Sequence, residues 1–208
     1  MQSNSEKGFI LRIIESSLAL WIRTRCRSIN NITVKINPSN TSITKGYISE
    51  VFITGKEINF QNIPIDYLQL SGKEIQIKAN MLGKKIYFNK NFIVKWEMNI
   101  SSRSLEELLL SDQWNWLGNL ICQKLLGMNH FDKVKIKNDY LEITCSNTIT
   151  SNTKIDDFNL NCTNGKLILT NKNSSGSFQI PMDESISIKN AYLKNCILSV
   201  FGKAKIYQ

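Results

Sequence analysis

Long runs of alternating apolar and polar residues constrain the fold of this chain more than any other feature. Apolar residues at every second position put their side chains on one face of a β-strand. In the clearest run, Phe92, Val94, Trp96, Met98 and Ile100 alternate with Ile93, Lys95, Glu97 and Asn99. Turn signals separate this run from others like it: Asn37-Pro38, Ser71-Gly72, Leu82-Gly83-Lys84 and Asn164-Gly165. Short turns between consecutive strands predict an antiparallel sheet, because parallel strands need crossover helices.

Two segments have a helical period instead. In residues 7–27 the apolar residues recur at spacings of three and four: Ile10, Ile13, Ile14, Leu18, Trp21 and Ile22. In residues 104–126, Ser104 and Glu107 form a capping box and Gly127 is a stop signal, and the segment is either one bent helix or two.

The order helix, strands, helix, strands predicts an α+β domain. We expect a curved, twisted antiparallel sheet wrapped against a central helix, with an N-terminal amphipathic helix along its edge or at one end. Residues 1–6 are expected to be disordered, and residues 7–208 to form a single domain. Bends and turns are assigned to the glycines at Gly46, Gly55, Gly72, Gly83 and Gly165.

Composition limits the partners without choosing one. The net charge of +9 favours an anionic partner, which is a nucleic acid, a lipid headgroup or an acidic protein. The lysines are spread along strand-like segments, so solvated sheet faces explain most of them. The longest apolar stretch, residues 9–22, is interrupted by Arg12 and Glu15, and we predict neither a transmembrane segment nor a signal peptide.

The residues that usually carry chemistry are sparse. The five cysteines include no CxxC pair, so we predict buried free thiols rather than disulfides or a zinc site. Reduced thiols favour a cytoplasmic location, and we expect the protein to be peripheral to a membrane. With His130 as the only histidine, a histidine-based metal site is excluded. No phosphate-binding loop, dinucleotide fingerprint or nucleophile elbow occurs. We therefore predict no enzyme activity, no cofactor and no metal.

Four segments carry a resemblance to a known family through their glycine and apolar spacing. They are Ile14-Glu-Ser-Ser-Leu-Ala-Leu-Trp-Ile-Arg-Thr-Arg-Cys26, Lys45-Gly-Tyr-Ile-Ser-Glu-Val-Phe-Ile53, Ser104-Leu-Glu-Glu-Leu-Leu-Leu110 and the ending at residues 186–204. Over most of its length the chain resembles the LmeA-like phospholipid-binding family, particularly its cyanobacterial-type members, and through it the tubular lipid-binding (TULIP-like) proteins. The resemblance implies a curved sheet wrapped on a helix and a groove for acyl chains, with no metal, cofactor or catalytic residue.

The resulting hypothesis is non-enzymatic binding or transfer of a phospholipid or another acyl lipid in an apolar groove between sheet and helix, at or near a membrane. The predicted walls are Ile53, Phe60, Phe92, Val94, Trp96, Met98, Trp114, Leu117 and Ile121. A solid core explains the same pattern equally well. The alternatives are a basic nucleic-acid-binding protein, although no nucleic-acid-binding motif is found, and a structural or assembly protein.

The N-terminal helix also has two interpretations. Its apolar stripe docks on the sheet, which we favour, or it lies on an anionic membrane. In the second case Trp21 sits at the headgroup level and Arg23, Arg25 and Arg27 contact lipid phosphates.

Overall fold

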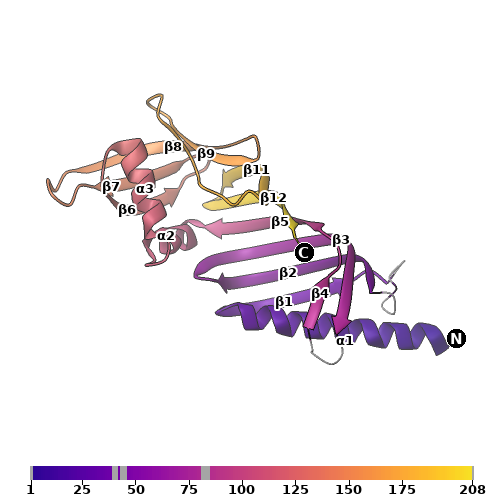
Figure 1. Ribbon diagram of the computed structural model, residues 1–208. Helices are drawn as coiled ribbons and strands as arrows, with labels where there is room; N and C mark the ends of the chain where they lie inside the picture. The colour runs from indigo at the N-terminus through magenta and orange to yellow at the C-terminus, as the bar shows by residue number, and fades with distance from the viewer. Residues whose placement is uncertain (1, 39–41, 43–45, 81–84, 208) are drawn as a thin grey trace.

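The computed structural model describes residues 2–38, 42, 46–80 and 85–207, and it is an α+β fold with three helices and two antiparallel sheets (Figure 1). The helices are α1 (Gln2–Arg25), α2 (Ser102–Leu110) and α3 (Asn115–Leu126). The strands are β1 (Ser28–Ile36), β2 (Tyr47–Phe60), β3 (Ile63–Asn80), β4 (Lys85–Phe88), β5 (Phe92–Ser101), β6 (His130–Ile136), β7 (Leu141–Ser146), β8 (Thr153–Thr163), β9 (Lys166–Asn171), β10 (Ser177–Gln179), β11 (Ile186–Lys194) and β12 (Ile197–Ile206). The predicted fold class is confirmed.

The strands divide into a large sheet of seven strands and a second sheet of five. The large sheet has the order β1-β2-β3-β5-β12-β11, with β4 paired to β3, and the second sheet has the order β10-β9-β8-β7-β6. The chain leaves the large sheet after β5, builds α2, α3 and the second sheet, and returns in β11 and β12 (Figure 1). Alternation identifies strands but not their partners, so this division could not be predicted from it.

Strand register gives the large sheet one apolar and one polar face. Residues directly opposite each other in paired strands share a face. Three rows of such residues cross all six strands of the main path: Ile36, Val51, Gly72, Val94, Ala204 and Ile186; Val34, Ile53, Leu70, Trp96, Gly202 and Ile188; Ile32, Gly55, Leu68, Met98, Val200 and Ala191. The row between the first two is Lys35, Phe52, Ser71, Lys95, Lys203 and Ser187, and it faces the other way. We call the side with the three rows the apolar face.

The β1 end of the apolar face is covered by α1. Leu11 of α1 is buried with Val34, Ile36 and Val51, and we call this group the α1 cluster. Other α1 residues pack against it: Ile14, Leu18, Ala19 and Ile22. The favoured prediction for this helix, docking at one end of the sheet, is confirmed. Ile13 and Trp21 were assigned to the docking stripe, but their side chains are 50% and 55% exposed and lie outside it.

The β11 end of the apolar face is covered by the second sheet together with α2 and α3. Ile100, Leu198 and Val200 of the large sheet are buried with Phe131, Phe158 and residues of both helices, a group that we call the second-sheet cluster. It contains the largest fully buried side chains among the described residues. The protein therefore has a core at each end of one continuous apolar face.

The predicted helix 104–126 is two helices, and its start was misassigned. The side chain of Ser101 caps α2 by accepting a hydrogen bond from the Ser104 N–H at 3.2 Å. Ser104 therefore lies inside the helix, and the capping box with Glu107 does not form. At the other end Gly127 has φ 66°, a left-handed conformation that ends α3 as predicted.

The cysteine prediction is wrong for one pair. Cys122 of α3 and Cys145 of β7, which are 23 residues apart in sequence, form a buried disulfide, whereas Cys26, Cys162 and Cys196 are free. Only tertiary packing brings the two together, and spacing could not predict it. The disulfide removes the argument for a cytoplasmic location that rested on reduced thiols.

A repeated Gly-Lys-Glu-Ile motif kinks both long strands of the large sheet. Glu57 in β2 and Glu74 in β3 have positive φ values of 49° and 54°. A Cβ atom on Gly55 would lie 2.9 Å from Ile58 Cδ1, and the second copy, 72–75, repeats this arrangement at 3.0 Å. Each isoleucine folds back over its glycine and stays buried. The predicted turn at Ser71-Gly72 is wrong, because β3 continues through it.

The remaining turn signals differ in outcome. Asn164 and Gly165, with φ values of 52° and 76°, form the β8–β9 hairpin as predicted. Gly46 has a φ of 65° and precedes β2. The predicted turn at Leu82-Gly83-Lys84 lies outside the described residues.

Candidate apolar binding site

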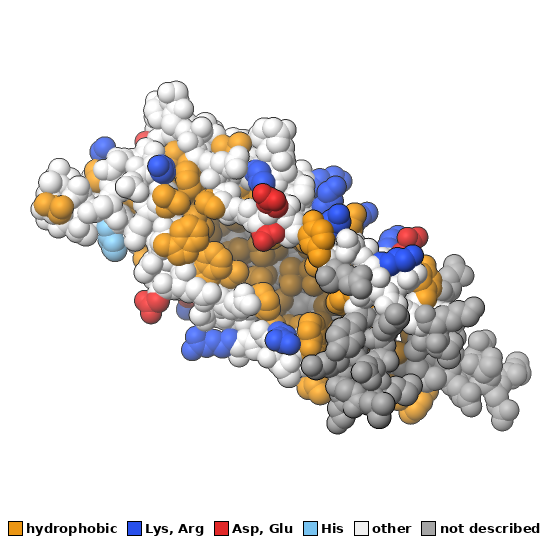
Figure 2. Space-filling model, in the orientation of Figure 1, with side chains coloured by type: hydrophobic (Ala, Val, Ile, Leu, Met, Phe, Trp, Pro, Cys, Tyr) orange, Lys and Arg blue, Asp and Glu red, His pale blue; other side chains and the backbone are white. Residues whose placement is uncertain are grey.

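The middle of the apolar face lies between the two clusters and is hollow. Figure 2 shows the hollow over the middle of the large sheet, with hydrophobic side chains on its floor. Leu68, Leu70 and Val94 occupy the central strands β3 and β5, and each is partly exposed. Within the described part of the chain, these three residues belong to neither cluster. The sheet thus presents apolar side chains there that α1 and the second sheet leave uncovered.

Small residues keep the floor of the hollow low. Val94 lies between Gly72 on β3 and Ala204 on β12. In the next row Trp96 lies beside Gly202, where a Cβ atom would be 2.5 Å from the indole Cζ2. The indole ring therefore rests against Gly202, where any larger residue would displace it.

Most predicted wall residues on strands flank this hollow. Ile53 and Phe92 pack against the α1 cluster, and Trp96 and Met98 pack against the second-sheet cluster. Val94 lies between them. Phe60 is at the end of β2, next to the turn into β3, with 39% of its surface exposed.

The predicted wall residues of the helical segment lie in another environment. Ile121 is buried within the second-sheet cluster and Leu117 packs against it, so both contribute to that core. Trp114 precedes α3, and its ring is stacked on Trp116 with centroids 6.3 Å apart. The hollow is therefore formed by the sheet, whereas the side of α3 that carries Leu117 and Ile121 belongs to the core.

Sequence reasoning missed Leu68, Leu70 and Ala204. The segment from Tyr67 to Ser71 alternates in the same way as residues 92–100, so the signal was present. What the sequence did not show is that β3 lies in the centre of the sheet, where its apolar residues fall between two covering layers.

Several charged residues of the large sheet lie on the opposite side from the hollow. Lys35, Lys95 and Lys203 belong to the polar row. Glu50 forms an ion pair with Lys73 at 3.0 Å, and the hydrogen bond from that lysine lowers the pKa of the Glu50 carboxyl. The floor of the hollow therefore offers apolar contact and no charged side chain from these rows.

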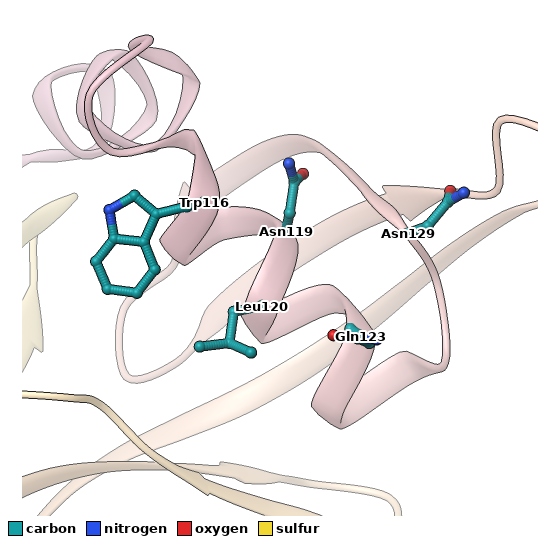
Figure 3. Close-up of a pocket in the computed structure, with 5 residues that line it drawn as sticks. All are labelled: Trp116, Asn119, Leu120, Gln123 and Asn129. Carbon is teal, nitrogen blue, oxygen red and sulfur yellow. The ribbon is translucent and has the colours of Figure 1, made fainter.

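A separate pocket of about 300 Å³ lies along α3 (Figure 3). It is lined by Trp116, Asn119, Leu120 and Gln123 of α3 and by Asn129. The Asn119 side chain accepts a hydrogen bond from the Phe131 N–H at 2.9 Å, and Asn129 donates one to Thr148 at 3.0 Å. Both amides are thus engaged in holding local structure.

The Asp156 carboxylate is held by structural hydrogen bonds. Burial raises the pKa of the Asp156 carboxyl, but hydrogen bonds from Asn171, the Asp157 N–H and Asn173 outweigh it and hold the pKa below its ordinary value. Among the residues that the structure describes, no group of three His, Cys, Asp or Glu side chains is arranged to hold a metal ion.

None of the helices, over the part of the chain that is described, is both long and apolar enough to cross a membrane.

No family model matches the chain, and neither a curated protein nor a solved structure is significantly similar to it.

Proposed function

We propose that the chain binds a phospholipid or another acyl lipid, without chemical change, and that the acyl chain lies in the hollow of the apolar face. One observation carries this proposal: Leu68, Leu70 and Val94 are partly exposed in the centre of a sheet whose apolar face is covered at both ends. Exposed apolar surface on a soluble domain is unfavourable unless something covers it.

An acyl chain matches this surface in chemistry and shape. It needs apolar walls and no hydrogen-bonding groups. Each buried methylene contributes about 0.8 kcal/mol, so a chain of many methylenes binds without a polar anchor. The resemblance of the sequence to the LmeA-like family points to the same class of ligand.

The direct test is extraction of lipid from the purified protein. We expect organic extracts to contain acyl lipid, and native mass spectrometry to show a protein adduct of the same mass. Protein that carries no lipid, even after incubation with phospholipid vesicles, would contradict the proposal and leave nucleic-acid binding or assembly as the alternatives.

Adjacent residues of β5 give a matched pair of variants. Val94 faces the hollow, whereas Ile93 is 51% exposed on the opposite face. Val94→Trp should fill the hollow and reduce bound lipid at least about tenfold, because its ring occupies space that the acyl chain needs. Ile93→Trp adds a similar bulk outside the hollow and should retain the lipid.

Circular dichroism and thermal melting would show that both variants are folded. Equal lipid content in the two folded variants would mean that the hollow is not the binding site.

A further inference from the structure

The outward side of α1 carries a second apolar stripe that no part of the described chain covers. Phe9, Ile13 and Leu20 are 66%, 50% and 64% exposed. At about 100° per residue they fall within roughly 40° of one another around the helix axis, and Leu18 of the docking side lies about 180° from Phe9. The helix is therefore apolar on two opposite sides, of which only one is buried.

Cations flank this outward stripe. Arg12 and Arg23 fall within roughly 60° of it on one side, and Trp21 lies roughly 80° from Ile13 on the other side. Arg25 is nearer the docking side, and it approaches the stripe only through its side chain. The Arg25 guanidinium lies over the Trp21 ring, 5.4 Å from its centroid. Glu15 is the only acid among the described α1 side chains, and its carboxylate is turned to the sheet, where it accepts a hydrogen bond from the Ile36 N–H at 2.7 Å.

We propose that α1 docks the protein on an anionic membrane surface, with Phe9, Ile13 and Leu20 inserted among the acyl chains and the arginines at the lipid phosphates. A helix with an exposed apolar stripe, an aromatic residue at its border and flanking arginines has the composition of an interfacial helix. Trp21, Arg23 and Arg25 then lie at the headgroup level, together with Arg27 just after the helix.

Charge favours a membrane over a second copy of this chain. Two copies paired through this stripe would bring the arginines of one helix against those of the other, which is unfavourable. Anionic headgroups neutralise the same arginines, and each cation near such a surface contributes attraction. The net charge of +9 acts in the same direction.

This inference does not depend on lipid binding in the hollow, although docking through α1 would hold the hollow beside the bilayer. The two proposals fail separately. Lipid extraction is measured on protein free of vesicles, whereas docking is measured by flotation with vesicles, in variants whose hollow is unchanged.

The first experiment is flotation with vesicles of phosphatidylcholine alone and of phosphatidylcholine with phosphatidylglycerol. We expect binding to the anionic vesicles only, with an affinity that falls as salt is added, because salt screens the arginines. Absence of binding to anionic vesicles at low salt would overturn the proposal.

The apolar arm uses two residues of equal exposure. Leu20 on α1 and Ile155 on β8 are both 64% exposed, so neither substitution should affect folding. Leu20→Ser should lower the affinity for anionic vesicles roughly tenfold, because it removes inserted apolar surface. Ile155→Ser should leave the affinity unchanged, and an equal loss in both variants would contradict docking through α1.

The charge arm compares three arginines with three lysines at the same spacing. Arg23, Arg25 and Arg27 follow each other at every second position, as do Lys133, Lys135 and Lys137 on and just after β6. Replacing either triplet by alanine removes the same net charge. Each arginine should contribute about a factor of five to the affinity for anionic vesicles, so the arginine variant should bind on the order of a hundredfold more weakly than the wild type. The lysine variant should lose far less affinity.

Two results of this arm would overturn the proposal. Equal losses in both triplet variants would mean that net charge alone attracts the protein, without a docking surface. A dimer in sedimentation equilibrium that Leu20→Ser dissolves, without vesicle binding by the wild type, would identify a second copy as the occupant of the stripe.

Discussion

At the scale of single residues, the shape of the hollow depends on where side chains are missing. Gly202 is the clearest case, since an added Cβ atom would lie 2.5 Å from the Trp96 ring and 2.8 Å from the Ser187 carbonyl oxygen. The close approach of the indole to the β12 backbone therefore requires glycine. If the ring were pushed away, it would move into the space above the sheet.

A pair of glycine substitutions tests this packing. Gly202→Ala should lower the free energy of unfolding by about 1–3 kcal/mol through overpacking. Gly8→Ala in α1, where nothing lies within 4 Å of the added carbon, should leave it unchanged or raise it by up to about 1 kcal/mol, since alanine favours the helix. Urea unfolding measures the stability of both variants. Equal stability of Gly202→Ala and the wild type would mean that the Trp96 ring can move to another position without cost.

At the scale of elements, periodicity predicted the secondary structure of each segment better than its tertiary contacts. The alternation of residues 92–100 gave β5 and its apolar face, and the helical spacing of residues 7–27 gave α1 and its docking. The disulfide between Cys122 and Cys145 was missed because neither residue has a local partner pattern. The Ser71-Gly72 turn was predicted wrongly because the glycine is required by Ile75, which folds back over it.

The disulfide gives the element-scale prediction. It joins α3 to β7 across 23 residues, and closing a loop of that length contributes about 3 kcal/mol by restricting the unfolded chain. We expect the Cys122→Ala/Cys145→Ala variant to unfold at lower urea concentration, and dithiothreitol to destabilise the wild type but not this variant. Cys196→Ser, at an exposed free thiol, should unfold like the wild type. The bond would be excluded if dithiothreitol did not change the stability of the wild type and if Cys122 and Cys145 reacted as free thiols after unfolding without reductant.

At the scale of the whole molecule, the candidate site arises from the distance between two cores. The sequence predicted an apolar face and could not separate a groove from a solid interior, because both have the same alternation. The difference lies in topology: β12 pairs with β5, so the second sheet covers one end of the large sheet while α1 covers the other. Leu70 and Val94 are left between the two covered ends.

A ligand in that space would touch residues that belong to both ends of the sheet, and its removal should therefore weaken the molecule as a whole. Binding to the folded state alone adds about 2.7 kcal/mol at a free lipid concentration of 100 times Kd. For a chain of 208 residues this corresponds to a rise in Tm of roughly 5–10 °C. We expect delipidated protein to melt lower by that amount and to recover when phospholipid is returned, as measured by scanning calorimetry.

Val94→Trp should melt at one temperature with or without lipid, while Ile93→Trp should behave as the wild type. A lipid-dependent rise in Tm that persists in Val94→Trp would place the stabilising lipid outside the hollow.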